Sequence, residues 1–209
     1  MLTKIKPELV IIDDNITEAY PLVDRLKMIY DADNIHIFPT TKEGIEYIEN
    51  NISKRIIVLL DIMFGSIAEG LNVFDAITEK SLLICFIIMT GSINNISKED
   101  LVKLINRHAW YIVQRDKPAQ YILDIIKKAD AHISSRVDSA LEEWVLRHSR
   151  EEQIRPFIKS RNGESYSLLD ILDSVRKGGD DNIGQEMISN ILAVAIDILA
   201  RDKSRIGNK

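Results

Sequence analysis

The stretch Ile56-Ile57-Val58-Leu59-Leu60-Asp61 decides the fold, because five aliphatic residues run directly into one acid. An apolar run this short and this rich in β-branched residues is typical of a strand covered on both faces, as in a parallel sheet. An acid at the end of such a strand lies at the carboxyl edge of the sheet, where open α/β folds bind their ligands. Asp61 is therefore a candidate site residue.

The same pattern recurs through the first part of the chain, where short apolar runs alternate with segments of helical periodicity. The sequence predicts further strands at residues 8–12, 35–38, 82–89 and 110–114, and helices that begin near Asn15, Thr41, Asn72, Ser97 and Pro118. Strict alternation of strand and helix predicts an α/β fold with a five-stranded, doubly wound parallel sheet and helices on both faces.

Three other strand ends carry residues of matching chemistry: the acid pair Asp13-Asp14, the hydroxyl residue Thr90, and the segment from Arg115 to Lys117. Three carboxylates at one edge repel one another unless a cation lies among them, and oxygen ligands suit Mg²⁺. A hydroxyl and a basic group beside them would hold phosphoryl oxygens. The pattern predicts transfer of a phosphoryl group to the carboxylate of Asp61.

Because of the residues at these four strand ends, residues 1–133 resemble the receiver domain of two-component response regulators, which has a flavodoxin-like fold. The resemblance implies that Asp61 accepts the phosphoryl group from a sensor histidine kinase or a phosphotransfer protein, and that Thr90 binds a phosphoryl oxygen. It also implies a Mg²⁺ site formed by Asp13, Asp14, Asp61 and the backbone carbonyl of Met63. The chain is not expected to be an enzyme beyond phosphoryl acceptance and slow self-dephosphorylation.

The sequence departs from this family at the fifth strand, after which the family usually has Lys-Pro, with an aromatic residue three positions before the lysine. The preferred alignment takes Lys117-Pro118 as this pair and puts Gln114 in the aromatic position. Counting from His108-Ala109, where the family often has Gly-Ala, instead aligns Arg115 with the lysine and Ile112 with the aromatic residue. Since both alignments lack the switch aromatic, a phosphorylation-independent pseudo-receiver scaffold is an alternative.

Residues 119–149 contain neither glycine nor proline, and their apolar residues fall three and four positions apart. One interpretation is that the last receiver helix continues as a connector over residues 134–150. The other is a pair of helices broken near Ser134-Ser135. A small all-α output or interaction domain is predicted over residues 151–209. Its last helix, from Ile183 to about Lys203, has a wide apolar stripe that needs a partner surface.

The chain has a formal net charge of −5 and a single cysteine, Cys85, inside an apolar run. No apolar run approaches the roughly 18 to 20 residues of a membrane span, and the N-terminus has no signal-peptide core, so a cytoplasmic protein is expected. The last helix is strongly apolar in its middle, and the tail carries about as many acids as bases, so a DNA-binding regulator is the weaker alternative. The tail is instead predicted to contact a protein effector, as a relay, phosphate sink or adaptor, and the connector to promote homodimers.

Overall fold

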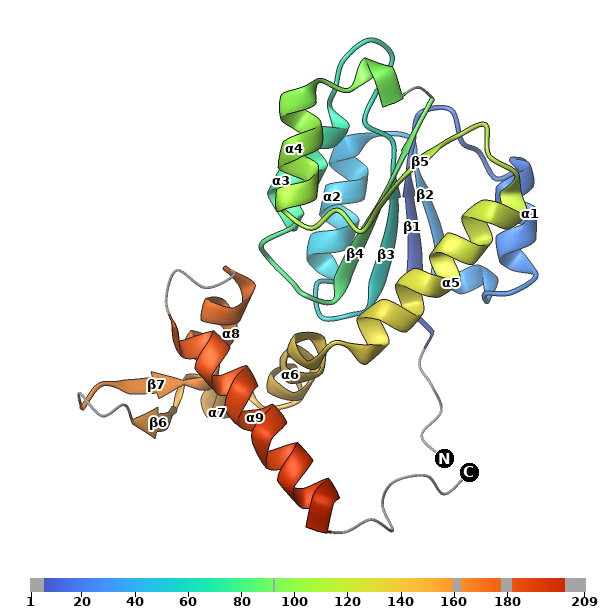
Figure 1. Cartoon of the computed structure of the whole chain (residues 1–209). Helices are drawn as coiled ribbons and strands as arrows, with labels where there is room; N and C mark the ends of the chain where they lie inside the picture. Colours follow the sequence, from blue (N-terminus) through green and yellow to red (C-terminus); the bar gives the residue numbers. More distant parts are fainter. Residues whose placement is uncertain (1–5, 92, 160–162, 178–181, 202–209) are drawn as a thin grey trace. The chain divides into compact units, whose positions relative to one another are not determined.

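The computed structural model describes residues 6–91, 93–159, 163–177 and 182–201, and the chain forms two compact units, residues 1–139 and 140–209. The first unit contains a five-stranded parallel sheet with the order β2-β1-β3-β4-β5 (Figure 1). This confirms the predicted α/β fold with a parallel sheet. Its strands are β1 (Glu8–Ile12), β2 (Ile35–Phe38), β3 (Ile56–Leu60), β4 (Ile84–Thr90) and β5 (Tyr111–Gln114).

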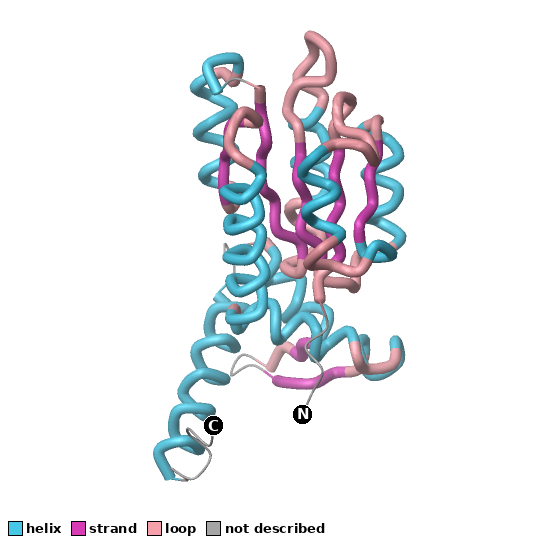
Figure 2. The backbone as a smooth tube through the Cα atoms, turned by 90° about the vertical axis from the view of Figure 1, so that its right-hand side faces the viewer, coloured by secondary structure: helices cyan, strands magenta, loops and turns pink. Residues whose placement is uncertain are grey.

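Helices cover both faces of this sheet, as the strands seen between two sets of helices in Figure 2 show. One face is covered by α1 (Pro21–Lys27) and α5 (Ala119–Ser135). The other face is covered by α2 (Thr41–Asn50), α3 (Gly70–Ile77) and α4 (Lys98–Asn106). Two 3-10 helices, η1 (Ala32–Asn34) and η2 (Ile93–Asn95), lie in the connections.

Each face of the sheet has its own apolar core, which explains why the strands read as unbroken apolar runs. Ile57 and Leu59 of β3 pack among the residues of α1 and α5, whereas Val58 and Leu60 pack among those of α2, α3 and α4. Successive side chains of a strand point to opposite faces, so a strand covered on both sides has no position left for a polar residue.

The first helix begins later than predicted. Asn15 does not start a helix but lies in a turn, in which its backbone N–H donates to Oδ1 of Asp13 at 2.8 Å. The helix α1 starts instead at Pro21, whose fixed φ suits the first helical position and whose missing N–H is not needed there.

The continuous connector helix predicted over residues 134–150 is wrong. Helix α5 ends at Ser135, Arg136 is extended (φ −78°, ψ 133°), and α6 (Val137–Leu146) follows, as in the alternative interpretation. Side chains supply the bonds that a continuing helix would have made. Ser135 Oγ donates to the carbonyl of His132 at 3.0 Å, and Asp138 accepts from the Ser139 N–H at 2.8 Å. The two units therefore divide within α6, after Ser139, and not at residues 133 and 150.

The second unit is mainly helical, but it is not all-α. An antiparallel hairpin of β6 (Pro156–Lys159) and β7 (Ser165–Ser167) lies between α7 (Arg150–Ile154) and α8 (Leu168–Arg176). A capping box begins α8 at Ser167, whose Oγ accepts from the Asp170 N–H at 3.2 Å while the Asp170 carboxylate accepts from the Ser167 N–H at 2.8 Å.

The last helix, α9 (Asn182–Arg201), packs on α8 through its first turns, where Gly184 lies against Val175. A Cβ atom at residue 184 would come within 2.7 Å of the Val175 side chain, so the glycine permits this close approach. Among the helices of the described residues, none is long and apolar enough to span a membrane.

A buried acidic site at the carboxyl edge of the sheet

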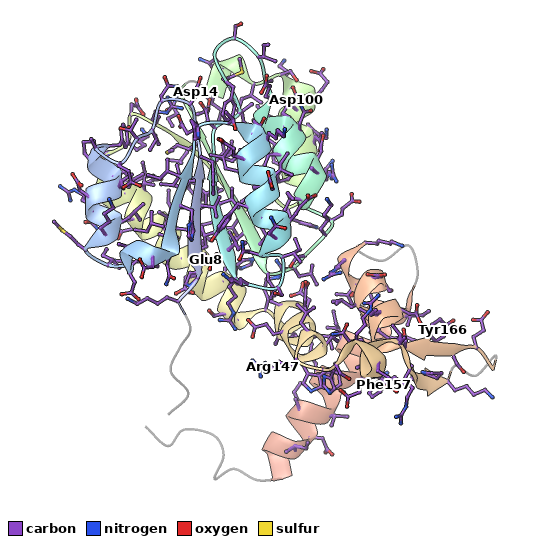
Figure 3. All side chains as sticks on the ribbon, turned by 180° about the vertical axis from the view of Figure 1, so that it is seen from behind. Glu8, Asp14, Asp100, Arg147, Phe157 and Tyr166 are labelled. Carbon is purple, nitrogen blue, oxygen red and sulfur yellow. The ribbon has the colours of Figure 1, made fainter. Side chains whose placement is uncertain are left out.

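The site is formed where β1 and β3 end. Their register pairs Ile12 with Leu60, so Asp13 and Asp61 leave the sheet side by side, and the Asp61 N–H donates to the Ile12 carbonyl at 2.9 Å. Asp13 is fully buried and Asp61 is 2% exposed, whereas Asp14 is exposed. Figure 3 shows Asp14 at this end of the first unit and Glu8, which begins β1, at the other.

The three predicted acids are brought together. Asp13, Asp14 and Asp61 each offer one carboxylate oxygen, and these oxygens lie within 4.8 Å of one another. Thr90, the last residue of β4, is fully buried, and its strand lies next to β3. The structure thus places all four predicted residues on neighbouring strands at one edge of the sheet.

Arg115, and not Lys117, is the basic residue at the acids. Its Nη2 lies 2.6 Å from Oδ2 of Asp13 and 2.6 Å from Oδ2 of Asp61. Its backbone N–H donates to the Thr90 carbonyl at 2.8 Å, which holds it directly beside β4. Lys117 is exposed, and its N–H closes a turn on the carbonyl of Gln114 at 3.2 Å. The geometry therefore corrects the preference for Lys117 in favour of Arg115.

The backbone of His108 supports the same alignment. Its φ of +64° lies in the left-handed region, which favours glycine, and it is the position where the resembling family often has Gly-Ala. Counting from His108-Ala109 is the alignment that matches Arg115 with the family lysine. Ile112, half-buried in β5 and paired with Ile88, then takes the place of the aromatic residue.

Every carboxylate oxygen of the three acids accepts a hydrogen bond. Arg115 donates to one oxygen of Asp13 and one of Asp61, as described above. Backbone N–H groups of Asn15, Met63 and Gly65 donate to Asp13 Oδ1 at 2.8 Å, Asp61 Oδ1 at 3.2 Å and Asp14 Oδ2 at 3.0 Å, and the Asn15 side chain donates to Asp14 Oδ1. These donors fix the orientation of all three carboxylates.

Two of these donors were missed as site residues in the sequence. The sequence pattern places Asn15 at the start of a helix and does not single out Gly65. The available signal was the glycine itself, because Gly65 has a φ of +58° and its N–H reaches Asp14 from the loop after β3.

Burial governs the electrostatics of the two inner acids. Removal from water raises the pKa of both Asp13 and Asp61 above the usual carboxyl range, because it disfavours the charged form. The backbone N–H donors and the nearby charge of Arg115 act in the opposite direction, toward the ionised form. A further positive charge near Asp13 and Asp61 would therefore stabilise their ionised carboxylates.

The residues fit a hard divalent cation. Three carboxylates that converge are the donor set that Mg²⁺ prefers, and the guanidinium between Asp13 and Asp61 shows that a cation is accommodated among their oxygens. Asp13, Asp14 and Asp61 would hold the ion. The fourth predicted ligand, the Met63 carbonyl, stays a prediction, although the Met63 N–H bond to Asp61 places this residue at the site.

No protein-family model matches the sequence, and no curated protein matches it either. Among solved structures, the chain is similar to the signal receiver domain of a protein described as a Luxo repressor from Vibrio parahaemolyticus. The two are 21% identical with a TM-score of 0.53, over 69% of this chain and 100% of that one.

Two further solved structures have lower TM-scores. A CheY-like response regulator receiver domain protein from Methanospirillum hungatei JF-1 is 22% identical with a TM-score of 0.46, over 58% of this chain and 91% of that one. A response regulator from Colwellia psychrerythraea is 14% identical with a TM-score of 0.47, over 60% and 98%. The strand order β2-β1-β3-β4-β5 and the similarity to the Vibrio parahaemolyticus receiver domain together show that the first unit of this chain has the fold of response regulator receiver domains.

Proposed function

We propose that the chain is a two-component response regulator in which Asp61 accepts a phosphoryl group, with Mg²⁺, from a sensor histidine kinase or a phosphotransfer protein. The observation that carries the proposal is a buried Asp61 at the carboxyl edge of a receiver fold, with Asp13, Asp14 and Arg115 around it. We expect the protein to act in the cytoplasm, with no catalytic turnover beyond this transfer and slow self-dephosphorylation.

In the proposed reaction, a carboxylate oxygen of Asp61 forms a bond to phosphorus while the bond from phosphorus to the donor imidazole nitrogen breaks. The electron pair of that bond stays on the nitrogen, which takes up a proton, and Asp61 becomes an acyl phosphate. When bound, the divalent cation supplies positive charge to the phosphoryl oxygens. We assign the Arg115 guanidinium and the Thr90 hydroxyl to the same oxygens, as donors from neighbouring strands.

Intact mass measurement after incubation with a small phosphodonor and Mg²⁺ tests this function. We expect the wild type to gain one labile phosphoryl group and Asp61→Asn to gain none. Asp116→Asn is the matched control, since Asp116 is an exposed acid next to Arg115 and should leave the gain unchanged. A wild type that gains nothing from any small donor or purified kinase would overturn the proposal.

For the second unit we propose a role in protein contact, either with an effector or with a second copy of the chain. The proposal rests on exposed apolar side chains in the C-terminal part of α9. Its exposed apolar residues are Leu192 (41%), Val194 (59%), Ile196 (65%) and Ile198 (47%). A helix with apolar side chains on several sides in water is normally covered by protein. The same residues lack the polar and basic groups that read DNA, which disfavours a DNA-binding output.

Light scattering on full-length protein tests the proposed contact. Val194→Glu places a charge on the apolar part of α9, and Asn190→Glu places the same charge on an exposed polar position one turn earlier. Loss of a dimer in Val194→Glu alone would assign the surface to self-association. Capture of the same effector by Val194→Glu and the wild type, with no dimer in either protein, would overturn the contact role of α9.

One observation favours a second function, a scaffold that works without phosphorylation. Ile112 occupies the position of the switch aromatic, so the ring that would couple Thr90 to the surface is absent there. Under this function, Asp61→Asn would bind its protein partners as the wild type does. Partner binding that depends on phosphorylated Asp61 would exclude it.

A further inference from the structure

Three aromatic side chains of the second unit lie together at its surface, where α6 ends. The ring of Trp144, in the last turn of α6, lies 4.5 Å from the ring of His148 and 6.1 Å from that of Phe157 in β6, measured between centroids. Trp144 is 40% exposed and Phe157 is 48% exposed. We call Trp144, His148 and Phe157 the aromatic patch. Exposed tryptophan and phenylalanine side chains in contact with each other are typical of a protein interface.

The aromatic patch has basic surroundings. The Arg147 N–H donates to the Trp144 carbonyl at 3.3 Å, and the Arg147 side chain is 74% exposed, 3.6 Å from Glu143, which is a weak contact in water. Figure 3 shows Arg147 and Phe157 in this part of the second unit. Residues 144–159 carry two exposed acids, Glu151 and Glu152, against four exposed bases: Arg147, Arg150, Arg155 and Lys159. The surface therefore suits an apolar partner that carries negative charge.

The C-terminal part of α9 has the complementary character. Between Met187 and Ile198 the only charged residue is Asp197, and the apolar side chains of residues 192–198 are exposed. Their exposure means that the described part of the same chain does not cover them. Because α9 is continuous over Asn182–Arg201, this part cannot fold back onto its own unit without breaking the helix.

We propose that the C-terminal part of α9 docks on the aromatic patch of a second copy of the chain, and that the exchange is reciprocal. This inference rests on the proposed contact role of the second unit and names both its partner and the receiving surface. Each copy supplies one helix and one patch, so a closed dimer with two-fold symmetry covers both apolar surfaces of both copies. In this arrangement Asp197 lies against Arg147 of the partner subunit.

Two features favour a second copy over an unrelated effector. The two exposed apolar surfaces are opposite in charge, and both belong to the same unit, so a single sequence provides both sides of the contact. An effector would have to present one apolar acidic surface to the aromatic patch and a separate apolar surface to α9. Opposite charges at the edge of an apolar contact also fix how the two surfaces align.

Sedimentation equilibrium of the full-length protein over a range of concentrations tests the inference. The wild type should dimerise, and Phe157→Ser should raise the dimer dissociation constant by roughly thirtyfold, as expected for a central aromatic residue of an interface. Met28→Ser is the matched control. It removes an apolar side chain that is 83% exposed in the first unit, and it should leave the dissociation constant unchanged.

Exchange of charges tests the pairing of Asp197 with Arg147 of the partner subunit. Arg147→Glu and Asp197→Arg should each raise the dimer dissociation constant on the order of tenfold, because each places like charges together. The protein with both substitutions should return close to the wild-type value. Lys177→Glu, which reverses an exposed charge at the end of α8, should have no effect. These positions are exposed, so the charge variants decide the question should Phe157→Ser fail to fold.

The outcomes separate this inference from the contact role on which it rests. A wild-type dimer that Val194→Glu abolishes and Phe157→Ser leaves unchanged would overturn docking on the aromatic patch and keep the contact role of α9. A wild type that stays monomeric at every concentration would overturn the second copy as partner and leave an effector as the occupant. Failure of the doubly substituted protein to recover dimerisation would overturn the pairing of Asp197 with Arg147 of the partner subunit.

Discussion

A Cβ atom on residue 70 would lie 2.0 Å from the backbone carbonyl oxygen of Asp61. It would also lie 2.7 Å from Cα of Ile62, so both clashes are with backbone atoms that cannot rotate away. Gly70 is the first residue of α3, and its N–H donates to the Ile62 carbonyl at 3.0 Å. The glycine therefore sets how closely α3 approaches the end of β3, where the Asp61 carboxylate lies.

Gly70→Ala should destabilise the protein by roughly 2 to 3 kcal/mol, because the helix must shift away from the Asp61 backbone. Urea unfolding measures this change. Gly91→Ala is the control, since a Cβ at residue 91 meets nothing within 4 Å, and it should change stability by no more than about 0.5 kcal/mol. Equal effects of the two substitutions would contradict the proposed packing constraint.

The raised pKa of Asp61 predicts a pH-dependent stability. Burial makes this pKa higher in the folded than in the unfolded protein, so ionisation of the carboxyl costs folding free energy. The cost is complete above the folded-state pKa and is lost as the pH falls from there to the unfolded-state pKa. We expect Asp61→Asn to be more stable than the wild type at neutral pH by on the order of 1 kcal/mol. The difference should shrink as the pH is lowered. Urea unfolding of both proteins at several pH values measures it, and a difference that grows on acidification would contradict the sign.

Cys85 should be chemically silent in the folded protein. Burial raises the pKa of its thiol to about 12, and the residue is 5% exposed in β4. The thiolate is the reactive form, so alkylation at mildly basic pH requires opening of the sheet. We expect no modification of the native protein by iodoacetamide and complete modification in urea, both followed by intact mass. Rapid labelling under native conditions would contradict the buried position.

The second unit contains an ion pair whose loss should be costly. Arg176 Nη2 lies 2.6 Å from Oε1 of Glu142, which is fully buried. Arg176→Met should destabilise the protein by about 3 kcal/mol, because a buried carboxylate loses its guanidinium. Arg147→Met is the matched control, since Arg147 is 74% exposed and 3.6 Å from Glu143, and it should cost less than about 1 kcal/mol. Similar melting temperatures for the two variants would contradict this ranking.

The sheet and the acids could be predicted from the sequence for a physical reason. A strand covered on both faces has to be apolar along its whole length, so the first polar residue after β3, Asp61, marks where the strand leaves the sheet. The same argument located Asp13 after β1 and Thr90 at the end of β4. The carboxyl ends of parallel strands lie at one edge of the sheet, so these residues come together regardless of the length or conformation of the loops.

The basic residue and the helix break depend on features that the sequence does not display. His108 adopts a positive φ although it is not glycine, so the alignment that selects Arg115 could not be preferred from residue types alone. The break at Arg136 occurs without glycine or proline, through local bonds made by Ser135 and Asp138. Such bonds offer the backbone an alternative to the helix that differs from it by only a small free energy, and the spacing of apolar residues does not reveal that difference.

The helix α6 belongs to both units. Ser139 Oγ donates to the Leu82 carbonyl at 3.0 Å within the first unit, and one turn later Glu142 pairs with Arg176 within the second. A cut between residues 139 and 142 would therefore divide a helix whose side chains each unit uses. A chimaera that joins the first unit to another domain after Leu146 would keep Ser139 but leave the buried Glu142 without Arg176, so Glu142 has to be replaced by an apolar residue in the same step.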